Sequence, residues 1–499
     1  MLPGGRLTVA PALEFNKVKE LVSATSGSLR LSLDDKSSTA ASGALSSGKG
    51  RFLAANCAMK AGTVVLLEQP LFCGNEEGNQ SRKAYIDEFF DLSENEDVEN
   101  DENIAHPFSP LADCLASILL TKQRELCAED EGDRTQAMLQ IQKLRSLFRI
   151  KVRDPVPEGS AVKFARVLRP ELCEVTSEEE IHDFLRIIIS NQFAHDNSCV
   201  DLMFAGSMFE HSCLPNCFLN TWRCAPGQAR TYIALQDIAE GEALSIDYLS
   251  LEDAYLPTKE RASMLEPWGF ACSCSRCTSL PEVTRCFLCP ACDESELCPP
   301  KPASEEHQLR CLFCGKSPTA EYTTRCFAAE AAISSSSSVS VDDVESAQLD
   351  VELCIGSLHH IPFREALWCV AQGPDTTEDL LAYEDYVDCL IQGISRLYKN
   401  PRHPHLLQFY HIKAALQHDN LDQQLLFLEH ERNVLCCYYP QEAKQLDGEI
   451  MQLVQKNGPA GDVDSASDGT AAASADVQEK QQDVDCASGL STADFMAMD

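Results

Sequence analysis

The sequence predicts an α+β fold in which short strands flank a helical segment and an all-helical region follows toward the C-terminal end. Residues 229–235 and 243–248 are rich in β-branched and aromatic residues with partial alternation, which is typical of short strands. Between residues 76 and 190, apolar residues recur at helical spacing. Residues 345–456 show the same spacing, punctuated by prolines. Strands and helices therefore occupy separate stretches of the chain.

Length and composition indicate a protein of several domains in a reducing compartment. The chain has 499 residues, 44% of them hydrophobic, and no apolar run approaches the length of a membrane span. Its first residues lack the apolar core of a signal peptide. Without an export signal, the 25 cysteines indicate thiols and metal ligands rather than disulfides. We therefore expect the protein in the cytoplasm, in the nucleus or in both, with no membrane attachment.

The charge limits the kind of partner. A formal net charge of -36 supplies no positive field for a phosphate backbone, so we expect no direct binding of nucleic acid. Lysine-rich protein segments suit this charge better. The alternative is that the acidic tails and loops serve only solubility.

Three motifs lie close together in residues 209–277. The first is the H-S-C-x-P-N segment His211–Asn216, whose proline and Ser/Asn residues are typical of a turn. The second is a predicted strand that ends at Tyr248. The third places Cys272, Cys274 and Cys277 within six residues. Because a structural zinc ion needs four ligands in a tetrahedron, we expect a fourth ligand from elsewhere in the chain.

In this order and spacing, the three motifs resemble the second half of a SET domain, a family that transfers methyl groups from S-adenosylmethionine to lysine. The glycine-containing turn at 48–50, which leads into predicted strands, is similar to the opening of that domain. The resemblance implies a SET-domain β-fold split by a helical insertion, followed by a post-SET zinc site. The nearest subfamily is the SET-and-MYND (SMYD) type. Only Cys114, Cys127 and Cys173 lie between residues 75 and 190, so this chain looks SMYD-like but without the MYND zinc finger.

The resemblance also implies roles for single residues. Tyr248 would lie beside the reacting methyl group and orient the lysine amine, whereas without the flanking motifs it would be read as a core tyrosine. The residues expected to bind the cofactor are Lys49, Gly50, Arg51, Asn191, Glu210, His211, Tyr248 and Phe270. Of these, Phe270 would stack on the adenine and His211 would act through its main chain. In SMYD-type proteins the fourth zinc ligand is the cysteine of the H-S-C-x-P-N turn, here Cys213.

A second metal site follows from spacing alone. Cys289, Cys292, Cys311 and Cys314 form C-x2-C-x18-C-x2-C, the spacing of a zinc ribbon. Cys286 and Cys298 leave the register of this site open, because Cys286 and Cys289 also form a C-x2-C pair.

Two departures from the family pattern keep a second hypothesis open. Glu210 stands where the family usually has an asparagine, and Trp268 stands where SMYD-type proteins often have a second tyrosine. The function we expect is methyl transfer to lysine side chains of a protein substrate, with histone tails among the candidates. The alternative is a catalytically inactive, zinc-binding SET-derived scaffold for protein partners. Binding of S-adenosylmethionine would separate the two.

The expected organisation follows from these motifs. The predicted segments are a disordered or only partly ordered N-terminal part (1–45), the first part of SET (46–75), a helical insertion with an acidic loop (76–190), the SET core (191–250), a post-SET zinc segment (251–280), a zinc ribbon-like module (281–325), a helical domain (345–456) and a disordered acidic tail (457–499). The helical domain is either similar to tetratricopeptide repeats or an irregular bundle. We expect helix caps at Asp133 and at Ser177, the latter forming a capping box with Glu180. We expect a monomer.

Overall fold

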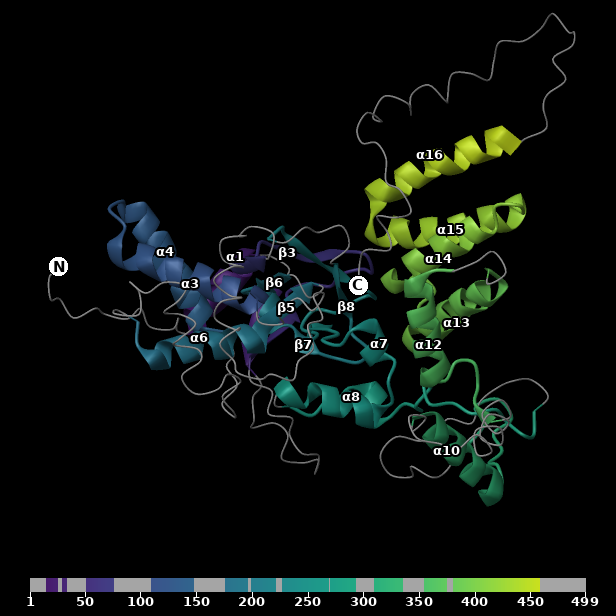
Figure 1. Cartoon of the computed structure of the whole chain (residues 1–499). Helices are drawn as coiled ribbons and strands as arrows, with labels where there is room; N and C mark the ends of the chain where they lie inside the picture. The colour runs from purple at the N-terminus through teal and green to yellow at the C-terminus, as the bar shows by residue number, and fades with distance from the viewer. Residues whose placement is uncertain are drawn as a thin grey trace, which may run out of the picture.

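The computed structural model describes residues 15–25, 29–33, 51–75, 109–147, 176–195, 199–220, 227–268, 270–292, 309–334, 354–374 and 380–457. A strand-rich part lies between the helices of residues 109–191 on one side and the stacked helices of residues 360–457 on the other (Figure 1). Some predictions fall outside the described residues, namely those on Lys49, Gly50, the acidic loop and the C-terminal tail from residue 458.

The strands in the described part of the chain form four small sheets. One antiparallel sheet has the order β3 (Val64–Glu68), β9 (Arg230–Ala234), β8 (Cys217–Asn220), and another has the order β4 (Phe72–Asn75), β6 (Cys199–Leu202), β5 (Gln192–His195). The two-stranded sheets are β1 (Leu29–Leu33) with β2 (Arg51–Ala55), antiparallel, and β7 (Glu210–His211) with β10 (Ser245–Ile246), parallel. Strands predicted over 229–235 and 243–248 are present as β9 and the shorter β10. The pairing of β7 with β10 brings the H-S-C-x-P-N turn beside the segment that ends at Tyr248.

Among the described residues, three helices lie between β4 and β5 in the sequence. They are α3 (Ser109–Cys127), α4 (Glu131–Arg145) and α6 (Glu178–Asn191), and their apolar faces join the strands in one core. The cap of α4 is Asp130, whose side chain accepts from the amide of Asp133 at 2.9 Å, so the prediction of a cap at Asp133 was wrong. Both residues are aspartates three positions apart, and the sequence does not distinguish the cap from the residue that it caps.

The start of α6 agrees with the predicted helix start at Ser177. The Ser177 hydroxyl accepts from the amide of Glu180 at 3.2 Å. The Glu180 carboxylate is paired with Arg145 and lies 3.7 Å from the ammonium of Lys122. It therefore links the start of α6 to α3 and α4.

Within the segment 1–45, predicted to be disordered or only partly ordered, residues 15–25 and 29–33 are ordered. These residues contain the helix α1 (Phe15–Thr25) and the strand β1. Val18 and Val22 are completely buried, and Leu29 is buried beside them in the same core. The helix has 11 residues and a Ser- and Gly-rich stretch follows it, so its single apolar stripe carries little weight in a sequence window.

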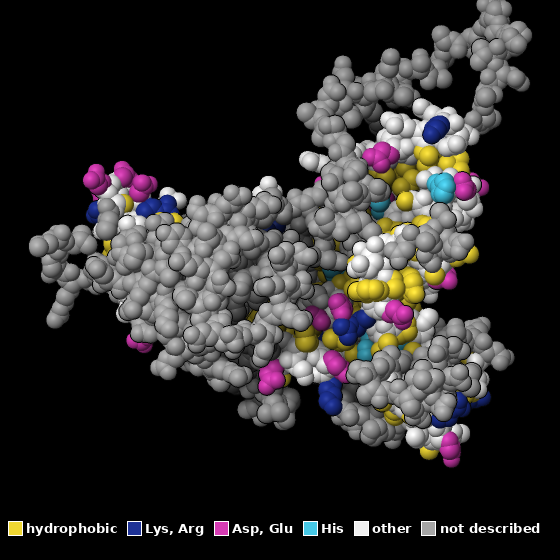
Figure 2. Space-filling view, viewed as in Figure 1, with side chains coloured by type: hydrophobic (Ala, Val, Ile, Leu, Met, Phe, Trp, Pro, Cys, Tyr) yellow, Lys and Arg dark blue, Asp and Glu magenta, His cyan; other side chains and the backbone are white. Residues whose placement is uncertain are grey.

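The C-terminal helices form a second core. α12 (His360–Gln372), α13 (Leu380–Tyr398), α14 (Leu407–Leu416), α15 (Leu421–Tyr438) and α16 (Pro440–Asn457) each pack on the next one along the chain. Ile233 and Leu235, at the end of β9, belong to this core, and the hydroxyl of Tyr439 donates to Asn220 at 3.1 Å. Figure 2 shows hydrophobic side chains along this stack with acidic and histidine side chains among them, and charges of both signs at the α3–α4 tip.

The remaining helical elements are distributed along the chain. They are η3 (Gly206–Met208), α7 (Leu251–Ala254), α8 (Thr258–Leu265), η4 (Glu266–Trp268), α9 (Ser275–Thr278), α10 (Ala320–Ser334) and η6 (Pro404–Leu406). Among the described residues, no helix combines the length and the apolar character that crossing a bilayer requires.

Candidate active site and metal centres

Tyr248 lies immediately after β10, with its ring half-buried in the strand-rich part. Its hydroxyl donates a hydrogen bond of 2.5 Å to the carbonyl of Phe209, and burial raises the pKa of the phenol above its ordinary value. The side chain is therefore a neutral phenol whose proton is already engaged. Its oxygen can still accept a hydrogen bond from another group.

Aromatic rings from two distant segments surround this phenol. The ring centroid of Tyr248 lies 5.2 Å from that of His211, 6.0 Å from that of Trp268 and 6.2 Å from that of Phe270, and the Phe270 ring is edge-on. Phe270 also lies 5.9 Å from the His211 ring and is 37% exposed. A partly exposed ring beside a buried aromatic group offers a face on which a planar ligand can stack.

His211 connects the tyrosine segment to the cysteines. Its Nδ1 accepts from the backbone amide of Tyr248 at 3.1 Å, and its Nε2 lies 3.3 Å from the sulfur of Cys213. Burial lowers the pKa of His211 to about 4, so the ring is neutral. Since Nδ1 is an acceptor, the single proton is on Nε2 and points to Cys213. One imidazole thus bridges Tyr248 and the cysteine group.

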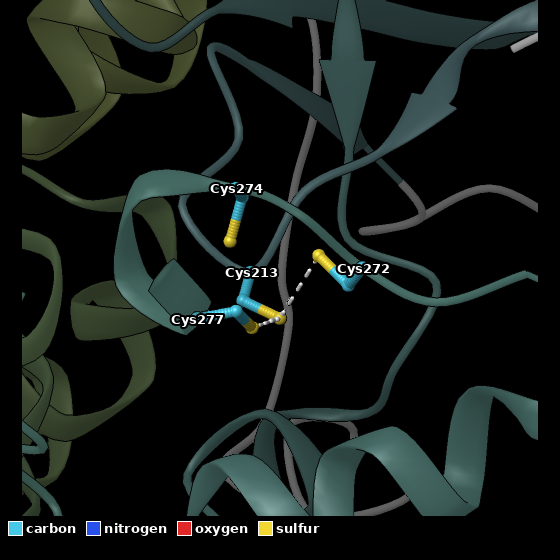
Figure 3. A group of neighbouring side chains, drawn as sticks. All are labelled: Cys213, Cys272, Cys274 and Cys277. Carbon is cyan, nitrogen blue, oxygen red and sulfur yellow. Dashed lines mark hydrogen bonds between the residues drawn. The ribbon is translucent and has the colours of Figure 1, made fainter. Parts of the chain in front are cut away.

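The four cysteines of the first predicted metal site are brought together. The sulfurs of Cys213, Cys272, Cys274 and Cys277 lie within 4.8 Å of one another, with 3.9 Å from Cys213 to Cys272 and 3.6 Å from Cys213 to Cys277. Figure 3 shows their side chains converging from the turn after β7, the 272–274 loop and α9. A zinc ion bound tetrahedrally to sulfur at about 2.3 Å needs sulfurs about 3.8 Å apart. The geometry suits a tetrathiolate metal site.

A buried arginine contacts this group. Arg261 on α8 donates from Nε to the sulfur of Cys213 at 3.3 Å and from Nη2 to that of Cys277 at 3.5 Å. Its Nη1 lies 3.4 Å from the carboxylate of Glu282. Four thiolates around a divalent metal carry a net charge of about -2, and a guanidinium beside them offsets part of that charge.

The second predicted group is also assembled. The sulfurs of Cys289 and Cys314 are 3.8 Å apart, those of Cys292 and Cys311 are 3.7 Å apart, and all four lie within 4.8 Å. Cys286 is buried nearby but belongs to no metal-type group of the described residues, and Cys298 lies outside them. The register with Cys289 and Cys292 as the first pair is therefore favoured.

Glu330, His359 and His360 form a third group whose ligand atoms lie within 4.8 Å of one another. Its hydrogen bonds suit a metal poorly. His359 Nδ1 accepts from the amide of Ile361 at 3.3 Å, so the neutral ring carries its proton on Nε2, 3.3 Å from the Glu330 carboxylate. Arg285 donates twice to the same carboxylate, at 2.7 and 2.6 Å. We interpret this group as a buried ion-pair cluster.

Asn216, the last residue of the H-S-C-x-P-N turn, has a role that the sequence did not suggest. Its amide nitrogen donates to the carbonyl of Ala243 at 2.8 Å and to the Glu242 carboxylate at 3.1 Å. Its amide oxygen accepts from the backbone of Ser245 at 2.9 Å. Asn216 thus fixes the segment that leads to Tyr248. The only sequence feature that could have pointed to this role is the position of Asn216 within the H-S-C-x-P-N motif.

The predicted cofactor residues are only partly brought together. Glu210, His211, Tyr248 and Phe270 lie at or beside the aromatic cluster. Arg51 is the first residue of β2, and only its backbone is described.

Asn191 lies at the end of α6. Its side-chain amide donates to the carbonyl of Ile187 at 2.8 Å, within its own helix, and its carbonyl accepts from Ser207 at 3.4 Å. Of these two contacts, only the one with Ser207 reaches toward the η3 segment beside the site.

A family model now identifies the domain that carries these residues. Residues 50–249 match the model described as "SET domain". The chain contains a SET domain. The match ends one residue after Tyr248, and Cys272, the first of the three clustered cysteines, lies 23 residues further along the chain.

Curated relatives match over short segments. The chain is 40% identical over 72 residues to the histone-lysine N-methyltransferase ATXR2 of Arabidopsis thaliana, covering 14% of each protein. It is 32% identical over 95 residues to the histone-lysine N-methyltransferase set5 of Schizosaccharomyces pombe, covering 19% of this chain and 28% of that one. A SET and MYND domain-containing protein of Dictyostelium discoideum is 32% identical over 111 residues, covering 20% and 25%. The matched segments thus span 14 to 28% of these relatives.

A solved structure, the SET domain of LSMT bound to lysine and AdoHcy, aligns with 89% of this chain and 94% of its own, at a TM-score of 0.31 and 11% identity.

Proposed function

We propose that this SET domain transfers methyl groups from S-adenosylmethionine to lysine side chains of protein substrates. The observation that carries the proposal is the placement of Tyr248. This residue lies within the SET match, and the carbonyl of Phe209 fixes its neutral phenol beside the aromatic rings of His211, Trp268 and Phe270. The relatives named as histone-lysine methyltransferases support this reaction class. The subfamily without a MYND finger stays a prediction.

The residues around Tyr248 fit the proposed cofactor. Phe270 offers a partly exposed ring for an adenine, and the half-buried carboxylate of Glu210 lies in the strand paired with β10. Such a carboxylate would favour a nearby cationic sulfonium. When bound, S-adenosylmethionine supplies an electrophilic methyl group on that sulfonium.

The chain's own contribution is positioning. The phenol of Tyr248 is neutral and its proton is held by Phe209, so it acts as an oriented acceptor for a lysine amine and not as a general base. The rings of His211, Trp268 and Phe270 lie 5.2–6.2 Å from the Tyr248 ring, centroid to centroid, and would exclude part of the solvent once cofactor and substrate are bound. In a dry site, such a fixed dipole contributes more to catalysis than it would in water.

We also propose that both cysteine groups hold zinc. Two sulfur pairs in each group lie 3.6–3.9 Å apart, close to the separation in a tetrahedral zinc site with four thiolates, and all four sulfurs of each group lie within 4.8 Å of one another. Zinc would crosslink chain segments in each group. At the first group, it would fix the turn that carries His211 and thereby the backbone of Tyr248.

Substrate and setting follow from charge and from the relatives. We propose lysine-containing protein substrates, with histone tails among them, since the chain is strongly acidic and two relatives carry the words histone-lysine in their names. Absence of nucleic-acid binding, a monomeric state and a cytoplasmic or nuclear location remain expectations from the sequence.

A non-catalytic scaffold is the second candidate. Glu210 favours it, because the family usually has an asparagine there, and a carboxylate cannot donate the hydrogen bonds of an amide. Titration calorimetry with S-adenosylmethionine separates the two functions. We expect saturable binding with one site per chain, and no binding to fully metallated protein would favour the scaffold.

A further inference from the structure

Glu68, the last residue of β3, is a buried carboxylate with an unusual set of partners. Its Oε1 accepts from the backbone amides of Phe204 and Ala205 at 3.2 and 2.8 Å, and its Oε2 accepts from that of Gly206 at 2.8 Å. Three consecutive amides that point at one anion form a nest, a backbone arrangement that binds negative charge. The carboxylate therefore fixes the main chain of residues 204–206.

This turn leads directly to Phe209. It opens η3, and the amide of Phe209 donates to the carbonyl of Gly206 at 3.3 Å. The Phe209 ring stacks on Tyr232, with centroids 4.6 Å apart and planes at 10°. Gly206 lies so close to the Tyr232 hydroxyl that an added Cβ would be 2.0 Å from it. The segment between Glu68 and Phe209 thus has little freedom to shift.

The carbonyl of Phe209 is the group that receives the Tyr248 hydroxyl, at 2.5 Å. A displacement of the 204–206 turn would move this carbonyl and with it the direction of the phenol. Losing 1 Å of alignment in a reacting geometry can cost roughly a hundredfold in rate.

We propose that Glu68 is a positioning residue for the Tyr248 hydroxyl, acting through the 204–206 amides and the carbonyl of Phe209. The proposal rests on the proposed methyl transfer. Glu68 lies 180 residues from Tyr248 in the sequence. In this proposal, it helps to orient the hydroxyl oxygen of Tyr248 that accepts from the lysine amine.

The test is a double-mutant cycle of Glu68→Gln and Tyr248→Phe. Methyl transfer from tritiated S-adenosylmethionine to a core-histone mixture is measured at saturating cofactor and well below each variant's Tm. Glu68→Gln keeps the volume but turns one acceptor into a donor, so we expect kcat to fall roughly tenfold while KM for the cofactor changes less than about twofold. In the Tyr248→Phe background, the same change should lower kcat less than about twofold, because the hydroxyl it orients is already absent.

Asp201→Asn is the matched control. Asp201 is also buried and receives a 2.9 Å hydrogen bond from Arg230, which starts β9, the strand paired with β3. Its loss should destabilise the same sheets, yet its effect on kcat should be the same with and without the Tyr248 hydroxyl. If Glu68→Gln does not fold, Glu68→Asp enters the cycle, because it keeps the charge and shortens the reach.

Equal effects of the Glu68 variant in both backgrounds would overturn its positioning role and leave the methyltransferase intact. No transfer by wild type with bound cofactor would overturn the proposed function, and with it this role. Hydrogen exchange at amides 204–206, slow in wild type and faster in Glu68→Gln, checks the nest independently of activity; unchanged exchange would count against it.

Discussion

At the scale of single residues, the first cysteine group combines ligands that are close in the sequence with a charge from another helix, since Arg261 donates to the sulfur of Cys213 at 3.3 Å. Ligands such as Cys272, Cys274 and Cys277 repeat at short spacing, so the sequence itself shows them. Arg261 and Glu68 contact residues 48 and at least 136 positions away, and no local pattern announces such contacts. The cysteine groups could therefore be predicted from the sequence, whereas the contacts of charged residues such as Arg261 and Glu68 could not.

The metal content can be tested with one variant in each group. We expect two zinc ions in reduced wild type and one each in Cys213→Ser and Cys289→Ser, measured by elemental analysis. Because His211 bridges Cys213 to the Tyr248 backbone, Cys213→Ser should also weaken S-adenosylmethionine binding, whereas Cys289→Ser should not. Equal cofactor affinities in the two variants would argue against the coupling.

Arg261 should stabilise the first metal group. In Arg261→Met the donors to Cys213 and Cys277 are lost, and we expect metal affinity there to fall roughly 10–100-fold, as for other residues that bond to metal ligands. A chelator competition assay measures the release. Arg276→Met is the control, since Arg276 is as deeply buried but donates to the carbonyls of Ala254 and Leu256. Faster release in the control than in Arg261→Met would contradict this role.

At the scale of elements, helices and strands could be predicted where the apolar periodicity is long, and not where it is short. The α6 start at Ser177 was predicted, because a capping residue and an apolar stripe agree there. α1 was missed, since one stripe in a Ser- and Gly-rich stretch resembles a disordered segment. β10 has only two residues and depends on its partner β7, which lies far away in sequence.

The cap of α12 provides a pH prediction. His359 is completely buried, accepts from the amide of Ile361, and has its pKa lowered by burial to about 4. The unfolded chain binds this proton near pH 6.5 and the folded one only near 4, so stability is lost as pH falls through that window. The loss at pH 4 is on the order of 3 kcal/mol.

Replacement of His359 checks this pH dependence. His359→Asn keeps a capping acceptor without a titrating group, so its free energy of unfolding should decrease less between pH 6.5 and 4 than that of wild type. His418→Asn, at an exposed site, should behave like wild type. Chemical denaturation at several pH values measures both. Parallel curves for wild type and His359→Asn would show that the cap is not the titrating group.

At the scale of the whole molecule, the strand-rich part and the C-terminal helices share contacts that the sequence could not indicate. Gly62, with a φ of +83°, lies so near the end of α15 that an added Cβ would be 2.3 Å from the Cys437 carbonyl. Only glycine meets both conditions without strain. In the sequence, Gly62 is typical of a turn residue between two strands. Its close approach to the Cys437 carbonyl can be seen only in the folded protein.

Gly62→Ala should therefore destabilise the protein by roughly 1–3 kcal/mol, because it adds a strained φ and a backbone clash. Gly448→Ala on α16 is the matched control, since nothing lies within 4 Å of the added Cβ, and it should stabilise by about 0.5–1 kcal/mol. Urea denaturation measures both. A neutral Gly62→Ala would mean that the contact between strands and helices is looser than the structure indicates.

The central claim is that Tyr248 orients the amine in a methyl transfer. The measurement is transfer of labelled methyl groups from S-adenosylmethionine to a core-histone mixture, comparing wild type with Tyr248→Phe at equal cofactor occupancy. Since the variant keeps the ring and loses one oriented oxygen, cofactor binding should persist while the rate falls roughly 10²–10³-fold, or about 2.7–4 kcal/mol. Equal rates in the two proteins would contradict the claim and leave Tyr248 a core tyrosine, and no transfer by wild type despite bound cofactor would favour the scaffold.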